Sequence, residues 1–107
     1  MAAASITCGG SLQCMVAGFL DEADFTGANL KGASLEEAGL EGAIMDGAVL
    51  ESAYLTKTID EAKSIKDVDF TDAVMPTFTQ KALCSRADAV GTNAKTGVET
   101  RESLMCP

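Results

Sequence analysis

Residues 23–57 read ADFTG ANLKG ASLEE AGLEG AIMDG AVLES AYLTK, which are seven consecutive blocks of five residues. Each block begins with alanine, at positions 23, 28, 33, 38, 43, 48 and 53. Two residues later each block has a large apolar side chain, namely Phe25, Leu30, Leu35, Leu40, Met45, Leu50 and Leu55. A period of five matches neither the 3.6-residue period of a helix nor the two-residue period of a strand. We therefore expect the chain to turn a corner after every five residues, with four sides and twenty residues in each coil.

In such a coil the alanine and the large apolar residue of each block point inward, because the space near the axis takes only small and aliphatic side chains. The blocks follow the loose consensus A-(D/N)-L-X-X, and from residue 23 to 57 the chain resembles the pentapeptide-repeat family. The resemblance implies an all-β fold, a short right-handed quadrilateral β-helix.

The repeat is disturbed between residues 58 and 64. Here the five-residue spacing places Asp60 and Lys63 in inward positions, where a buried ion pair would be costly. An outward bulge is favoured, and the capping-box sequence from Thr58 to Glu61 predicts that one helical turn could begin there instead. Phe70 follows Leu50 by twenty residues, so the register is expected to be kept across the disturbance.

The repeat predicts three regions: an N-terminal cap at 1–22, the repeat coil at 23–77 and a C-terminal cap at 78–107. The coil holds about eleven blocks and would be only about 14 Å tall, with coils stacked like neighbouring strands. So short a solenoid exposes its core at both ends and needs caps. In the second cap, Thr77 to Gln80 fits a capping box that predicts a short helix at 81–86.

The C-terminal tail carries a more specific resemblance. Its residues Leu83-Cys84-Ser85-Arg86, Gly91-Thr92-Asn93, Thr96-Gly97-Val98, Thr100 to Leu104 and Cys106 resemble the tails of thylakoid lumenal pentapeptide-repeat proteins and their cyanobacterial relatives. That resemblance implies a disulfide between Cys84 and Cys106, which would close about 23 residues and contribute about 3 kcal/mol. Cys8 and Cys14 enclose a short glycine-containing loop and form the expected second bridge. Redox regulation of the Cys84–Cys106 pair remains an alternative to a structural role.

Composition excludes several classes of function. The chain has 107 residues, 16 acidic and 8 basic side chains and no histidine, giving a formal net charge of −8. An acidic surface disfavours nucleic acid and anionic membranes, and no apolar stretch reaches the roughly 20 residues that span a bilayer. Without histidine the usual general base and the commonest metal ligand are missing. We expect no catalytic residue, no metal and no cofactor.

The acidic residues are unevenly distributed. Residues 21–53 hold eight acidic side chains against Lys31, a net charge of −7, whereas 54–107 hold eight acidic and seven basic ones. Asp21, Glu41 and Glu61 are twenty apart and should form a ladder on one side of the coil. This ladder is interpreted as a solvated face, with docking of a basic partner or calcium binding as alternatives.

Apolar residues occupy outward positions that the family usually gives to Asp or Asn, namely Ile44, Val49, Tyr54, Ile59 and Val74. Tyr54 and Val74 are twenty apart and should stack on one face. Because adjacent exposed apolar side chains mark interfaces, and tyrosine is frequent at binding hot spots, this pair is the best candidate for an interaction site.

The tail resemblance and the four cysteines point to an oxidising compartment, the chloroplast thylakoid lumen or a cyanobacterial lumen or periplasm. The N-terminal residues lack the charged region of a targeting peptide, so we expect any such peptide to be missing from this sequence. The leading hypothesis is a non-catalytic structural or protein-interaction protein, an accessory subunit docked on a photosystem or another thylakoid complex. A redox-regulated lumen protein is the alternative. A gyrase-binding DNA mimic is disfavoured, because the coil is too short and the acidic surface is broken by Lys57, Lys63, Lys66 and Lys81.

Overall fold

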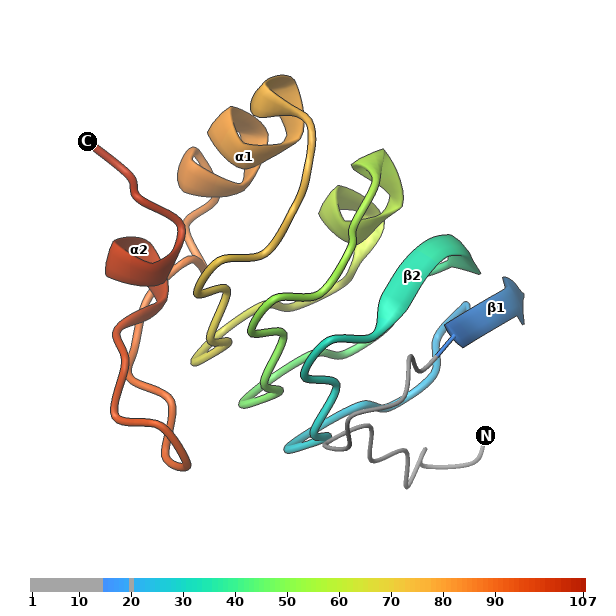
Figure 1. The fold of residues 1–107 in the computed structure, drawn as a ribbon, viewed down its shortest axis with the longest axis horizontal. Coiled ribbons are helices and arrows are strands. Elements are labelled where there is room, and N and C mark those ends of the chain that lie inside the picture. Colours follow the sequence, from blue (N-terminus) through green and yellow to red (C-terminus); the bar gives the residue numbers. More distant parts are fainter. Residues whose placement is uncertain (1–14, 20) are drawn as a thin grey trace.

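A computed structural model of the protein describes residues 15–19 and 21–107. Along the chain it contains strands β1 (Met15–Phe19) and β2 (Ser34–Gly39), the 3-10 helix η1 (Lys57–Glu61), and helices α1 (Thr77–Cys84) and α2 (Thr100–Ser103). Figure 1 shows successive turns of the chain stacked side by side, with β1, β2, η1 and α1 following one another along one edge. Helix α2 and the C-terminal loops lie at the end opposite β1 (Figure 1).

Successive turns pair through the backbone at a spacing of twenty residues. Parallel bridges join Asp24 to Ile44 and Ile44 to Ser64, Asn29 to Val49 and Val49 to Asp69, and Ser34 to Tyr54 and Tyr54 to Val74. Strand β1 pairs with β2 in a parallel two-stranded sheet, in which Phe19 lies opposite Gly39. The expected twenty-residue period is therefore present, and it extends below residue 23 into the predicted N-terminal cap.

Most corners are hydrogen-bonded turns between two inward residues, whereas β2 continues through the corner expected between Leu35 and Ala38. In the turn after Phe25, the N–H of Ala28 donates to the carbonyl of Phe25 at 2.9 Å, and Gly27 between them has φ +70°. A positive φ at the third position is typical of a type II turn. Glycine holds this position at 27, 32, 42 and 47, whereas Ser52, Asp67 and Asp72 adopt the same left-handed conformation with side chains present.

The inward positions form the core, as the sequence predicts. The alanines at 33, 38, 43, 48 and 53 and the large residues at 25, 30, 35, 40, 45, 50 and 55 are all buried. Aspartate and asparagine at the outward positions close the next corner, since Thr26 donates its N–H to Asp24 Oδ1 at 2.9 Å and Thr71 to Asp69 Oδ1 at 2.9 Å. The preference for these residues at that position thus has a local cause.

The disturbed segment forms the 3-10 helix η1. Asp60 and Lys63 are exposed, as the favoured interpretation requires, and the apolar residues beside them, Ile59 and Ala62, fill the inward positions instead. The helical turn begins earlier than predicted: its N-cap is Thr56, whose side chain accepts from the N–H of Thr58. Ile59 is therefore a core residue, and its assignment to the outward surface is wrong.

The helix of the C-terminal cap also begins earlier than predicted. Helix α1 spans Thr77–Cys84, whereas the capping-box interpretation placed it at 81–86. Its N-cap is Pro76, which provides no side-chain hydrogen bond. The predicted capping box is therefore absent, and the carbonyl of Pro76 accepts from the N–H groups of Thr79 and Gln80 at 3.0 and 3.1 Å.

Candidate functional site

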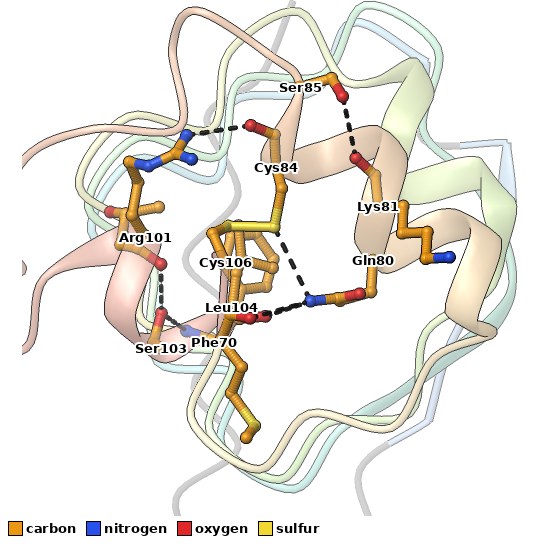
Figure 2. The surroundings of a disulfide bond; sticks show 11 residues. Phe70, Gln80, Lys81, Cys84, Ser85, Arg101, Ser103, Leu104 and Cys106 are labelled. Atoms are coloured by element: carbon orange, nitrogen blue, oxygen red, sulfur yellow. Dashed lines mark hydrogen bonds between the residues drawn. A yellow bond between two sulfur atoms is a disulfide. The ribbon is translucent and has the colours of Figure 1, made fainter.

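The disulfide between Cys84 and Cys106 joins the last residue of α1 to the C-terminal tail. Its sulfur atoms are 2.06 Å apart, and the two half-buried cysteines pack against the core. Figure 2 shows two further ties between the same elements. Gln80 of α1 donates from Nε2 to the carbonyl of Leu104 at 2.7 Å, and Arg101 of α2 donates from Nη1 to the carbonyl of Cys84 at 2.9 Å. Helix α1 is therefore held covalently to the tail that follows α2, and hydrogen bonds join it to that tail and to α2.

A second connection joins the loop after α1 to the disturbed segment. Arg86 donates from Nη1 to the carbonyl of Asp60 and from Nη2 to the carbonyl of Ala62, both at 2.9 Å. It also forms a two-point ion pair with Asp88, at 2.8 Å for each contact. The hydrogen bond from Arg86, reinforced by the backbone N–H of Ile65, lowers the pKa of Asp88 below its usual value. Sequence reasoning missed this role of Arg86, because the two carbonyls that it binds lie more than twenty residues away in the sequence.

A third connection is the loop 90–99, which lies against one column of corners in the coil. Asn93 is fully buried, and its Nδ2 donates to the carbonyls of Gly47, Ala48 and Asp67 at 2.9–3.2 Å. Its Oδ1 accepts from the N–H groups of Lys95 and Thr96, while Lys95 Nζ donates to the carbonyl of Gly27. Positions 27, 47 and 67 are twenty apart, so this loop contacts three successive coils. We call residues 90–99 the strap.

The predicted interaction pair lies together on the surface. Tyr54 is 43% exposed and Val74 is 54% exposed, and the two are neighbours in the same parallel ladder. The other outward apolar residues differ from the prediction. Ile44 is half-buried, and Val49 is buried because it lies beside the corner that the strap covers. The outward face is thus reduced to Tyr54 and Val74, and whether it binds a partner stays a prediction.

The acidic ladder is also assembled. Asp21, Glu41 and Glu61 are all exposed, and the N–H groups of Glu22 and Gly42 donate to the carbonyls of Glu41 and Glu61 in the next coil. Lys63 lines a shallow cavity of about 340 Å³ together with Glu22, so a cation lies close to this ladder. Cys8 and Cys14, the other predicted bridge, lie outside the described residues.

Two further findings concern residues 15–19 and 21–107. Among these residues, no group of three or more His, Cys, Asp or Glu side chains is placed to hold a metal ion. None of the helices described is long and apolar enough to cross a membrane.

Comparison with known proteins places the repeat and the tail in context. No family model matches the sequence. The chain is similar to the thylakoid lumenal protein TL20.3, chloroplastic, of Arabidopsis thaliana, with 50% identity over 42 residues. That match covers 39% of this chain and 14% of the relative, so the chain spans only a small part of the relative's length. It is also similar to a pentapeptide repeat protein from the Arabidopsis thaliana thylakoid lumen whose crystal structure is known.

The similarity to the crystal structure has 33% identity and covers 82% of this chain and 67% of that one. The TM-score is 0.46, so the superposition is loose and the assignment rests on the sequence identity together with the five-residue blocks. The chain belongs to the pentapeptide-repeat proteins. Both relatives are thylakoid lumenal proteins, which supports the thylakoid lumen as the location of this chain.

Proposed function

We propose that the chain is a non-catalytic protein-interaction protein of the thylakoid lumen, an accessory subunit docked on a thylakoid membrane complex such as a photosystem. The observation that carries this is the pair Tyr54 and Val74, adjacent exposed apolar residues at the position where three blocks carry Asp24, Asn29 and Asp69. The corner hydrogen bond that an aspartate makes there is missing from both. Since that bond stabilises the turn, its loss is consistent with selection for contact rather than for folding.

The fold that we propose for this function is a right-handed quadrilateral β-helix closed by caps. The coil supports it through three bridged sides and a fourth at η1, each contributing inward residues. Such a coil is rigid, because every turn is hydrogen-bonded to the next, and it holds Tyr54 and Val74 in a fixed relative position. The acidic ladder of Asp21, Glu41 and Glu61 would steer a basic partner toward this protein.

Affinity purification from solubilised thylakoids tests the proposal. The tagged protein is expected to recover a membrane complex, and the double variant Tyr54→Ser/Val74→Ser is expected to recover much less. The matched control is Thr56→Ser, a change on the same side that removes only a methyl group. Recovery of the free monomer alone, or equal recovery by wild type and double variant, would contradict the proposed docking site.

The Cys84–Cys106 bond supports a second candidate function, redox regulation. Cys84 lines an open cavity of about 430 Å³ together with Lys81, Arg101 and Met105, so a dithiol reductant can approach the bond. Reduction would remove the covalent link between the tail and α1 and leave the hydrogen bonds of Gln80 and Arg101 in place. A redox titration by thiol alkylation and mass spectrometry measures the midpoint potential. A bond that stays oxidised at about −300 mV would be structural and would remove this candidate.

A further inference from the structure

The C-terminal end of the coil presents backbone groups that the next coil would occupy if there were one. In the lower coils these groups are paired in a repeating manner. The N–H of Leu35 donates to the carbonyl of Tyr54, and the N–H of Tyr54 donates to the carbonyl of Ala33, both at 2.8 Å. Twenty residues later Val74 pairs in the same way with Leu55 and Ala53. The next members of this series, Ala73 and Met75, belong to the last coil.

On other sides of the coil, groups of the C-terminal cap accept hydrogen bonds from N–H groups of the last coil. The N–H of Ile65 donates to Asp88 Oδ2 at 3.1 Å, and the N–H of Asp67 donates to the carbonyl of Val90 at 2.9 Å. The N–H of Phe70 donates to Ser103 Oγ at 2.9 Å. In the part of the chain that the structure describes, the N–H of Met75 and the carbonyl of Ala73 have no partner. One side of the end is therefore an open strand edge.

The inward side chains on that side are also uncovered. Ala53 and Leu55, one coil below, are 0% and 3% exposed, whereas Ala73 and Met75 are only half-buried. A cavity of about 240 Å³ lies directly on them, lined also by Phe70, Gln80 and Leu104. Figure 2 shows Gln80 reaching from α1 to the carbonyl of Leu104, which keeps this wall of the cavity in place. The open edge and an apolar hollow thus coincide.

We propose that this edge binds an extended segment of a partner protein as an added parallel strand, with a small residue and, two positions later, an aliphatic residue pointing inward. The central residue of the segment donates its N–H to the carbonyl of Ala73 and accepts from the N–H of Met75. Its neighbours place the small side chain over Ala73 and the aliphatic one over Met75, as Ala53 and Leu55 do on the coil below. Main-chain pairing supplies the affinity and the hollow supplies the specificity.

The kind of segment that binds this edge follows from the parallel ladder of Ser34, Tyr54 and Val74, which the segment would continue. The edge has the spacing and direction of the coil, so a segment that resembles one side of the coil fits it best. A second copy of this chain is a poor donor, because its described small-x-aliphatic segments at 23–55 are already engaged in the coil. The inference rests on the proposed function only in requiring a protein partner. It uses the end of the coil, whereas the docking face is the outward side at Tyr54 and Val74.

A blocked peptide with the sequence of residues 51–56, ESAYLT, tests the site without any thylakoid component. Added at roughly 1 mM to the isotope-labelled protein, it is expected to shift the amide resonances of Ala73, Met75 and Leu104 and to slow exchange of the Met75 N–H. N-methylation at the peptide's tyrosine removes the donor to Ala73 and is expected to weaken binding about tenfold or more. N-methylation at its leucine alters an N–H that faces away, so this peptide should bind normally.

The protein variant Ala73→Glu fills the hollow with a charged side chain and is expected to abolish peptide binding. Ala94→Glu places the same change at an exposed alanine in the strap and should bind normally, and thermal unfolding of both variants verifies folding. Absent shifts at 73–75, shifts confined to Tyr54 and Val74, or equal binding of the two methylated peptides would each overturn the inference. Failure here leaves the proposed docking intact, since thylakoid purification reports on a different surface.

Discussion

Replacement of Arg86 by methionine should destabilise the protein more than any other single arginine or lysine substitution among the contacts described. The side chain of Arg86 is only 18% exposed, and its guanidinium joins two carbonyls of the disturbed segment to the carboxylate of Asp88. Methionine keeps much of the apolar stem but removes all of these donors. The carbonyl of Ala62, a residue that is 5% exposed, then loses its partner.

The magnitude follows from the hydrogen bonds that are lost. A hydrogen bond to a charged group contributes about 1.5–3 kcal/mol net, and a partly exposed ion pair contributes about 1 kcal/mol or less. The contacts of Arg86 share one side chain, so their contributions do not add fully. We expect a loss of about 3 kcal/mol in the free energy of unfolding, which for a domain of this size lowers Tm by roughly 12–24 °C.

Urea and thermal unfolding followed by circular dichroism measure this loss on the oxidised protein. Arg101→Met is the matched control, because Arg101 is exposed and makes a single hydrogen bond, to the carbonyl of Cys84. It should cost about 1 kcal/mol. Faster hydrogen exchange at Ile65, whose N–H is held by Asp88, should accompany Arg86→Met alone. Equal losses in the two variants, or less than about 1 kcal/mol for Arg86→Met, would refute the assigned role.

Three further outcomes follow from the structure. Because the pKa of Asp88 is lowered in the folded protein, its carboxylate stabilises the fold above its ordinary value of 3.8, and this contribution disappears as the pH falls through the lowered pKa. The wild type should therefore exceed Asp88→Asn in stability at pH 7 and lose that advantage in acid, as pH-dependent urea unfolding would show. Gly32→Ala should lower the free energy of unfolding by about 1 kcal/mol through backbone strain alone, because φ at residue 32 is +73° and nothing lies near the added methyl group. The reverse change one coil later, Ser52→Gly at φ +60°, should raise the free energy of unfolding by up to about 1 kcal/mol. The double variant Cys84→Ser/Cys106→Ser should lose about 3 kcal/mol in the same assay while keeping the circular dichroism spectrum of the coil.

The core was predictable from sequence because the repeat restates each inward position many times. Seven consecutive blocks define the inward positions, so one irregular block does not obscure them. Ala43 and Leu50, for example, are buried as expected. Local irregularity was less predictable. At the disturbed segment a strict spacing of five predicts that Asp60 and Lys63 point inward. The residues that are buried instead are Ile59 and Ala62, each one position earlier. Preference for the apolar neighbour would have located them, since a buried charge is far more costly than a shift in the chain.

Contacts made from a distant part of the chain were not predictable. Val49 follows the outward pattern of Tyr54, and only the strap, some forty residues later, makes one buried and leaves the other exposed. Asn93 likewise lies in a segment that reads as a polar, turn-rich loop. Its one informative feature is the tail resemblance, which includes that asparagine but says nothing of the carbonyls that it contacts.

The strap explains why the tail is more specific than the repeat. A repeat block contacts only its neighbours, so many sequences satisfy it. Asn93 and Lys95 instead contact positions 27, 47 and 67, which exist together only where three coils are stacked in register. The disulfide then fixes the end of the same tail to α1. A tail of this kind therefore requires a coil of this height, and it leaves the side at Ala73 and Met75 uncovered. The short coil and its open edge are consequences of one arrangement, in which the cap binds N–H groups of the last coil on other sides and leaves open the side that continues the ladder of Tyr54 and Val74.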